Sequence, residues 1–209
     1  IRLAGAAAGT WIAVHLPFAL AAPGGWWEFF RYNAARVADW DSLWYIACER
    51  TTGQTCTNTQ LINLASLVMF VAWVAFVWVI KSRRDPGFPR WTLGFPILVL
   101  FLLTNKVYSP QFSLWLLPWF ALAFPNLGWF VAFEIADIAV FVTRFSWFGT
   151  YVGIDDGFAG LPLGVFQIAV GIRAAILVLC VIGWIRAQRE APSQATPIEA
   201  EPVTAKVPA

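Results

Sequence analysis

The sequence predicts an all-α fold, a polytopic transmembrane helix bundle of about six spans with an outward interfacial amphipathic helix. Composition is the first reason. Of 209 residues, 59% are hydrophobic, 12% are charged and 13 are Trp, which is typical of integral membrane proteins. The second reason is that apolar residues gather in runs approaching the roughly 20 residues that cross a bilayer. We therefore expect a transmembrane helical domain over 1–190, with an outer loop at 23–60, and a disordered tail over 191–209.

The first apolar run has an alternative interpretation as a secretory signal peptide, since Arg2 precedes an apolar stretch that ends in small residues before Pro23. His15 and Pro17 interrupt its most hydrophobic part, which favours a span. Because the sequence starts at Ile1 and not at Met, we expect an N-terminal part of the same polypeptide to complete the protein. The six predicted crossings are 2–22, 61–80, 91–104, 112–125, 129–145 and 161–185.

The third and fourth of these crossings are short, and the polar segment NKVYSPQ separates them at 105–111. At about 1.5 Å per residue, the stretch 91–104 rises only about 21 Å. The segment should therefore be a helix-breaking turn at or just below the outer interface. Such a turn is tolerated at membrane depth where it lines a cavity or packs against protein.

Basic residues set the expected orientation. Lys81–Arg90 holds four Lys or Arg in ten residues, and the tail begins with Arg186 and Arg189. The positive-inside rule makes these segments cytoplasmic, so that the C-terminus is cytoplasmic and the loops at 23–60, 105–111 and 146–160 lie outside. The stretch 191–209 is rich in Pro, Ala and Glu without an apolar period, which predicts disorder.

The outer loop contains GWWEFFRYNAARVADWDSLWYIACER, residues 25–50. At 100° per residue this segment separates into two faces and predicts a single helix lying on the membrane. Asp39 would face water, and Asp41 would lie at the boundary between the faces. The apolar face comprises Trp26, Phe30, Val37, Trp40 and Trp44, and the polar face comprises Glu28, Arg31, Asp39 and Ser42.

Asp39, Asp41 and His15 are the candidate catalytic residues. The Asp-Trp-Asp pattern fits two acids that solubilise a surface helix, and it also fits the metal-binding or catalytic carboxylates of sugar transferases. A divalent cation therefore stays an option, although we assign no metal ligands. His15, the only histidine, is placed roughly 10 Å below the outer surface by the helical rise. It is either a hydrogen-bonded packing residue or a catalytic group near the outward cavity.

The three cysteines have separate expected roles. Cys48 and Cys56 fall in the outer loop, where a disulfide is chemically permitted. A zinc site is the weaker interpretation, because two cysteines without a nearby His make half of one. Cys180, inside the last span, is expected to be a packing residue.

Ionisable residues inside spans are costly and usually face a partner or a wet cavity. Glu134, Asp137 and Arg144 share one face of the fifth crossing, and Arg173 lies at a similar depth on the sixth. We expect Arg173 to pair with Asp137 or Glu134 and so to tie these two helices together.

Lys106 places a cation in the interfacial turn, next to hydrogen-bonding groups. One interpretation is a site for a lipid-attached phosphate, since a compact ammonium neutralises phosphate well. The other is a side chain that snorkels to the headgroups as a topology anchor. Trp115 and Trp119 are expected to wall a groove there. The accompanying polar residues are Asn105, Tyr108, Ser109 and Gln111.

The stretch NKVYSPQFSLWLLPW resembles the Asn-Lys-x-x-Ser-Pro-Gln segment of bacterial multi-span glycosyltransferases of the C-type superfamily. It is most similar to that of family 87, the polyprenol-phosphate-mannose-dependent mannosyltransferases, and FFRYNAARVADWDSLWY resembles their outer-loop helix. The two blocks cover about a fifth of the chain. The resemblance implies a polyprenyl-phosphate-linked sugar as donor, a lipid or cell-wall glycan as acceptor, and an outward-facing reaction at the bacterial plasma membrane. It also implies that Lys106, with Asn105, Ser109 and Gln111, lies near the donor's phosphate.

The chain departs from the pattern of this family in its number of spans and in the position of its acids. The family has more spans than six, and its catalytic acid lies in the first outward loop of the full protein. Asp39 and Asp41 stand in for that acid here, without matching its motif.

Two other classes of function stay open, and one is excluded. A transporter or flippase of a lipid-linked or anionic substrate would use Glu134, Asp137 and Arg173 as a path, and a non-catalytic scaffold would dock through the amphipathic helix. Nucleic-acid binding is excluded by dispersed basic residues without a basic stripe. No nucleotide-binding motif is present, which fits an enzyme that works outside the membrane with no cofactor beyond its lipid-linked donor.

Overall fold

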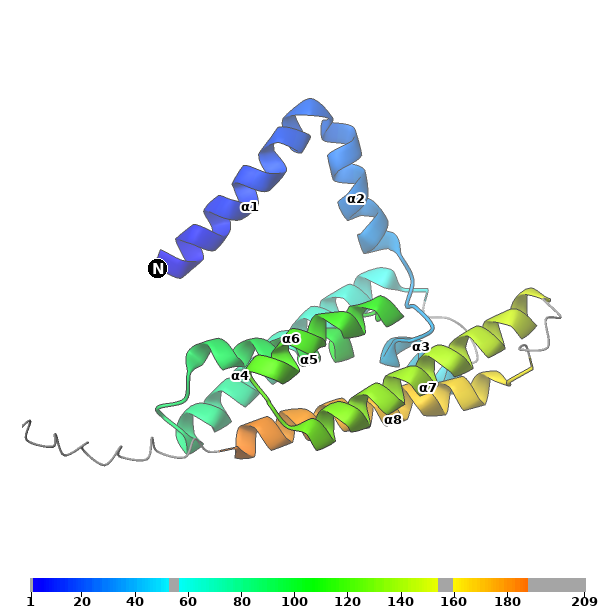
Figure 1. The fold of residues 1–209 in the computed structure, drawn as a ribbon. Helices are drawn as coiled ribbons and strands as arrows, with labels where there is room; N and C mark the ends of the chain where they lie inside the picture. Colours follow the sequence, from blue (N-terminus) through cyan, green and yellow to red (C-terminus); the bar gives the residue numbers. More distant parts are fainter. Residues whose placement is uncertain (1, 53–56, 154–159, 188–209) are drawn as a thin grey trace, which may run out of the picture.

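The computed structural model describes residues 2–52, 57–153 and 160–187. Within these ranges every regular element is a helix (Figure 1). The predicted disordered tail lies outside the described residues, as does Cys56, although Cys48 is disulfide-bonded. The α-helices are α1 Arg2–Ala21, α2 Pro23–Ala35, α3 Leu43–Thr52, α4 Thr59–Arg84, α5 Gly94–Thr104, α6 Leu117–Leu122, α7 Leu127–Val152 and α8 Leu163–Arg186, with 3₁₀ helices η1 Arg90–Leu93 and η2 Pro110–Leu116.

Helices α4 to α8 form the body of the molecule, and α1 with α2 forms a bent arm that stands away from it (Figure 1). The chain bends by 117° between the two arm helices, so that α2 folds back beside α1 in a sharp corner. Pro23 begins α2, a position where its missing N–H costs nothing because the first helical turn has no partner for it. The residues of α1 whose side chains are described are exposed almost throughout, so that its apolar surface is available to lipid.

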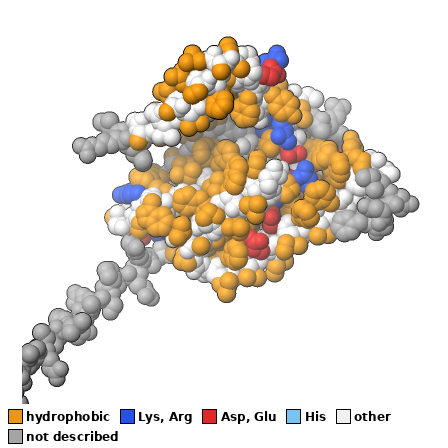
Figure 2. All heavy atoms as spheres, turned by 45° about the horizontal axis from the view of Figure 1, so that its top comes forward, with side chains coloured by type: hydrophobic (Ala, Val, Ile, Leu, Met, Phe, Trp, Pro, Cys, Tyr) orange, Lys and Arg blue, Asp and Glu red, His pale blue; other side chains and the backbone are white. Residues whose placement is uncertain are grey.

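The length and apolarity of the helices agree with the membrane character predicted from composition. Within the described ranges two of them, α4 and α8, are long and apolar enough to cross a membrane, and the bent α1–α2 pair makes a third if it counts as one span. Apolar side chains cover most of the face seen in Figure 2, with charged groups in a few places. The stretches 61–80, 129–145 and 161–185, predicted as crossings, form the helices α4, α7 and α8. Among the described residues α7 is not apolar enough to count as a span, so the prediction of about six spans is not confirmed.

Two of the sequence-based expectations are wrong. The stretch 112–125 is not one helix, because η2 and the six-residue α6 divide it, and α6 starts only at Leu117 next to Pro118. The stretch 25–50 is not one helix either. It leaves the helical conformation at Arg36, whose ψ is 133°, and becomes helical again only at Leu43.

The body has two chemically distinct ends. The C-terminal ends of α4 and α8 meet at what we call the basic end, where Lys81 on α4 donates to the carbonyl of Ala187 just after α8 at 2.5 Å. At the opposite end, which we call the loop end, the backbone N–H of Asp39 donates to the carbonyl of Lys106 at 2.8 Å. The residues that give the basic end its charge are Lys81, Arg83, Arg84, Arg90 and Arg186.

The core is aromatic and lies between α5, α6, α7 and α8. Phe95 contacts Phe120 and Phe124 with ring centroids 5.1 and 5.4 Å apart, and Phe120 stacks on Phe133 at 5.3 Å. All four rings are buried. This packing fixes α5, whose C-terminal end carries the polar turn that sequence analysis singled out.

Trp119 takes a position different from the one expected. Its ring packs against Gly94 at the start of α5, whereas Lys106 follows the end of that 11-residue helix, about 16 Å away by the helical rise. Trp115 stacks on Phe112 with ring centroids 4.4 Å apart. Neither tryptophan walls the groove at Lys106, because η2 and α6 carry the chain back along α5.

Gly94→Ala should therefore destabilise the fold. A Cβ at Gly94 would lie 1.9 Å from an atom of the Trp119 ring, and overpacking of this kind costs about 1–3 kcal/mol. We expect a lower midpoint of thermal unfolding in detergent. Gly171→Ala is the matched control, since a Cβ there meets nothing within 4 Å and Ala is the better helix former. An unchanged midpoint for Gly94→Ala would contradict the packing.

Candidate functional site

Lys106 holds the end of α2. Its ammonium donates to the backbone carbonyls of Ala34 at 3.0 Å and Arg36 at 2.6 Å. The last carbonyls of a helix have no partner within the helix and carry partial negative charge, so a buried cation is favourable there. Asn63 on α4 also donates to the carbonyl of Ala34, at 2.9 Å. Burial lowers the pKa of the Lys106 ammonium, and the nearby Arg36 charge adds to this effect.

The segment 36–42 forms a tight turn after this capped end. The carbonyl of Asp39 accepts from the backbone N–H of Ser42 at 2.9 Å and from its hydroxyl at 2.6 Å. The Ser42 hydroxyl in turn accepts from the N–H of Tyr45 at 3.1 Å, so that Ser42 caps α3. Asp and Ser compete with helical hydrogen bonding in this way, which explains why the predicted continuous helix breaks here.

Asp39 does not face water as predicted. Its side chain is 12% exposed and lies 3.4 Å from the guanidinium of Arg36, and its other oxygen accepts from the N–H of Trp40 at 3.0 Å. Ser42, expected on the polar face, is buried. The tight turn, and not a helical face, decides where these side chains point.

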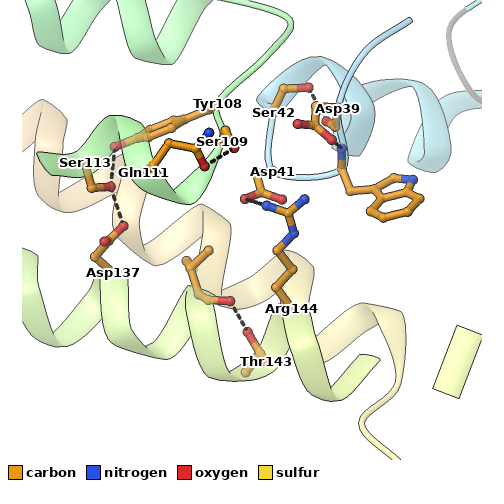
Figure 3. Close-up of polar contacts among 12 residues, drawn as sticks. Asp39, Asp41, Ser42, Tyr108, Ser109, Gln111, Ser113, Asp137, Thr143 and Arg144 are labelled. Atoms are coloured by element: carbon orange, nitrogen blue, oxygen red, sulfur yellow. Dashed lines mark hydrogen bonds and ion pairs between the residues drawn. The ribbon is translucent and has the colours of Figure 1, made fainter. Parts of the chain in front are cut away.

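Asp41 is the most buried acid among the described residues of the loop end. Its side chain has no exposed area, and one oxygen accepts from Arg144 on α7 at 3.0 Å (Figure 3). The other oxygen has no hydrogen-bond partner among the described residues. Burial raises the pKa of Asp41 to about 7, against the opposing effect of Arg144.

The stability of the protein should therefore decrease as the pH rises from about 4 to about 7. In this window the folded chain holds a proton on Asp41 that the unfolded chain, with a pKa near 3.8, has already released, and the stabilisation is lost above the folded-state pKa. Asp41→Asn should flatten this slope in thermal unfolding followed against pH. Glu28→Gln, which removes an exposed carboxyl, should retain it. A slope that Asp41→Asn leaves unchanged would contradict the assignment.

A second ion pair, between a buried arginine and a half-buried aspartate, lies beside the first. Arg173 on α8 donates to Asp137 on α7 at 2.9 Å and is 1% exposed. The predicted pairing is confirmed, with Asp137 and not Glu134 as the partner. Ser113 donates to the same Asp137 oxygen at 2.6 Å, and the Arg173 guanidinium lies 3.8 Å from the ring centre of Tyr108.

The two pairs belong to one polar cluster. Asp41, Tyr108 and Arg173 all line a cavity of about 10 Å³, a space no larger than about one water molecule. Figure 3 shows Asp41 and Arg144 meeting between the α3 loop and α7, with Tyr108, Ser113 and Asp137 to one side. We call this set the loop-end cluster, and its members are Asp41, Tyr108, Ser113, Asp137, Arg144 and Arg173.

The polar residues of NKVYSPQ point in different directions. Asn105 accepts from the N–H of Val107 at 3.2 Å, and Ser109 donates to Gln111 at 2.6 Å on the surface. Tyr108 is buried in the loop-end cluster. The predicted phosphate-binding residues therefore do not converge on one point, although Asn105 and Lys106 stay together.

Asn105 and Lys106 line a hollow of about 310 Å³ between α4 and α5. We call it the lateral hollow. Its polar part also includes Asn63 and Ser66, and the Ser66 hydroxyl has no hydrogen-bond partner among the described residues. Its apolar part is formed by Leu67, Phe70 and Phe101. The hollow is thus polar near Lys106 and apolar along α4.

His15 belongs to the arm and not to the loop-end cluster. It accepts from the indole N–H of Trp26 at 3.1 Å and stacks on Trp11 with ring centroids 4.4 Å apart. The contact with Trp26 joins α1 to α2 across their bend. The structure does not bring His15 together with Asp39 or Asp41 in any contact among the described residues.

Several residues of the site were not selected from the sequence. Asn63 and Ser66 are spaced i, i+3 in an otherwise apolar helix, which is a signal that could have found them. Ser113 looked like part of a span. Arg144 was noted only for its helical face, and its partner Asp41 lies too far away in sequence for spacing to reveal it.

Within the described ranges, no group of three or more His, Cys, Asp or Glu residues could hold a metal ion.

Comparisons of the chain with protein-family models, with curated proteins and with solved structures each find no match. Any assignment of function therefore rests on the residues themselves and on how they meet.

Proposed function

We propose that the chain is a membrane glycosyltransferase that transfers a mannose-like sugar from a polyprenyl-phosphate donor to a lipid or cell-wall glycan. One observation supports this above all. The two segments that resemble such enzymes, far apart in sequence, meet at the loop end through the hydrogen bond from Asp39 to the carbonyl of Lys106. An acid-bearing turn and a cation-bearing turn thus lie side by side, as the reaction requires.

The lateral hollow is the proposed donor site. Lys106 and Asn105 would contact the phosphate, with Asn63 and Ser66 as further hydrogen-bonding groups. The isoprenoid would lie along Leu67, Phe70 and Phe101, reached from the bilayer through the side of the molecule. A cation near the leaving phosphate stabilises the charge that develops when its bond to the sugar breaks.

Asp41 and Asp39 are the proposed acids. The base takes the proton of the acceptor hydroxyl, the acceptor oxygen bonds to the anomeric carbon, and the polyprenyl phosphate leaves. A pKa of about 7 suits Asp41 to this role.

Asp41 and the lateral hollow lie on opposite sides of the segment 102–108. Leu102, Leu103 and Tyr108 line the cavity at Asp41, whereas Thr104 to Lys106 line the hollow. The acceptor must therefore open the 36–42 turn to reach Asp41, or use the less buried Asp39.

In this proposal the basic end is cytoplasmic and the loop end faces outward, as the positive-inside rule requires. Helices α1, α4, α7 and α8 cross the bacterial plasma membrane, and α2 lies along the outer interface beyond the 117° bend. Helices α5 and α6 with η2 are too short to cross alone. They form a re-entrant pair, so that the proposed topology has four crossing helices and one re-entrant pair in place of six full crossings.

The test is transfer of radiolabel from polyprenyl-phosphate mannose in membranes that contain the full chain, with membranes lacking it as control. Label in lipid or glycan supports the transferase. Label that crosses the membrane without incorporation would support a transporter instead. If the label is neither incorporated nor moved across the membrane, a non-catalytic scaffold is supported. The Asp137–Arg173 ion pair makes a transport path less favoured, because each charge is already held by the other.

A further inference from the structure

A second hollow, of about 470 Å³, lies at the basic end of the body. Lys81 lines it and is buried, with its side chain 5% exposed. Phe88 and Trp184 form its inner wall and are also buried. Trp91 and Leu122 line it as well and are exposed, at 56% and 66%. The hollow is therefore charged at its base and apolar at its rim.

The Lys81 ammonium is the base of this hollow. It donates to the carbonyl of Ala187 at 2.5 Å and lies 3.2 Å from Asp85. The rings of Trp184 and Phe88 lie 5.2 and 5.7 Å from it. Lysine has three donors, so that its ammonium can contact a further anionic group from the hollow that it lines.

Positive charge dominates around the hollow. Arg83 and Arg84 are exposed in the last turn of α4, Arg90 is exposed in η1, and Arg186 ends α8. The Arg90 guanidinium lies 4.9 Å from the ring centre of Phe88, a wall residue. Asp85 is the acid that lines the hollow. A ligand that fits this balance of charge carries negative charge.

The position of the hollow points to a membrane lipid. Its lining includes Lys81 and Asp85 from the end of α4 and Trp184 and Ala187 from the end of α8. Among the described helices these are the two that are long and apolar enough to cross a membrane, and their C-terminal ends lie at the same end of the body (Figure 1). Such an end lies at headgroup depth, where exposed tryptophans such as Trp91 prefer to be. Basic pockets between transmembrane helices at this level bind anionic headgroups.

We propose that this hollow binds the phosphate headgroup of an anionic phospholipid, with the acyl chains passing over Trp91 and Leu122. Lys81 contacts the phosphate, and Arg84 and Arg90 supply the surrounding positive charge. The lipid holds the ends of α4 and α8 against η1. This site is separate from the lateral hollow and does not depend on the proposed transferase activity.

Native mass spectrometry of the full chain in detergent tests the proposal. The probes are dioleoylphosphatidylglycerol and dioleoylphosphatidylcholine, which have the same acyl chains, and inorganic phosphate in a parallel thermal-shift arm. We expect the wild type to retain phosphatidylglycerol at least fivefold more tightly. Equal retention of the two lipids would overturn the proposal, as would thermal protection by inorganic phosphate equal to that by phosphatidylglycerol, since a free anion would then be the ligand.

Three variants at the hollow and one control on the arm sharpen the test without replacing the buried Lys81. Arg84→Gln and Arg90→Gln, at exposed positions, should each weaken phosphatidylglycerol binding about fivefold, in line with the charge of one arginine near a membrane surface. Asp85→Asn should strengthen it, because the phosphate no longer competes with a carboxylate for Lys81. Arg31→Gln removes an exposed arginine on the arm and should change nothing. If neither Arg84→Gln nor Arg90→Gln changes the affinity for phosphatidylglycerol, the lipid binds elsewhere and the proposed site is refuted.

Discussion

Lys106→Ala is expected to reduce sugar transfer by about 10²-fold or more, the scale of removing one charge-stabilising group from a reacting centre. The variant still folds, because the aromatic core between α5 and α8 is untouched. It loses some stability as well, since the carbonyls of Ala34 and Arg36 lose their charged partner. The measurement is initial rate against donor concentration, with thermal unfolding on the same samples.

Lys106→Gln separates the two roles of this lysine. A glutamine amide can still donate to the carbonyls at the end of α2, but it carries no charge. If the ammonium serves the donor phosphate, Gln and Ala reduce transfer equally while Gln costs less stability. If the lysine only caps α2, Lys106→Gln keeps transfer near the wild-type rate, and the phosphate assignment fails. Asn126→Ala removes the hydrogen bond that caps α7 and controls for the loss of one cap alone.

The parallel between the two ends of the body explains why Lys106 is hard to interpret from the sequence. Lys81 and Lys106 are both buried, and each donates to carbonyls at the end of a helix that is distant in sequence, α8 and α2 respectively. The sequence predicts Lys106 as a cation at an interface. The partner carbonyls could not be predicted, because they become available only when α2 ends at Ala35 and reaches α5.

Long apolar helices were the predictable part of the fold. Helices α4, α7 and α8 follow from the length of their apolar runs, and the depth of Arg173 relative to Asp137 follows from the helical rise. The break at 36–42 could not be predicted from hydrophobic period, because the Ser42 cap and the partners of Asp39 and Asp41 override it. The lateral hollow also escaped prediction, since it depends on how α4 packs against α5.

Arg173→Leu should be the most destabilising single substitution in the loop-end cluster. It leaves the half-buried Asp137 with the Ser113 hydroxyl as its hydrogen-bond partner and removes the guanidinium from the Tyr108 ring. Loss of one member of a buried ion pair costs about 3–5 kcal/mol, so we expect a large fall in the midpoint of chemical unfolding in detergent. Glu134→Gln, on the same face of α7, is the control and should stay within about 0.5 kcal/mol of the wild type.

The double variant Arg173→Leu with Asp137→Leu tests whether the ion pair makes the fold more stable than two apolar side chains would. Two apolar side chains in place of a buried ion pair are often neutral or stabilising, because the desolvation cost of both charges disappears. We therefore expect the double variant to recover most of the stability that Arg173→Leu loses, with a coupling energy above about 1 kcal/mol in the cycle. Additive losses would show that Arg173 acts mainly through the Tyr108 ring and not through Asp137. Recovered stability with lost sugar transfer would instead assign the pair to the geometry of Asp41, whose cavity Arg173 lines.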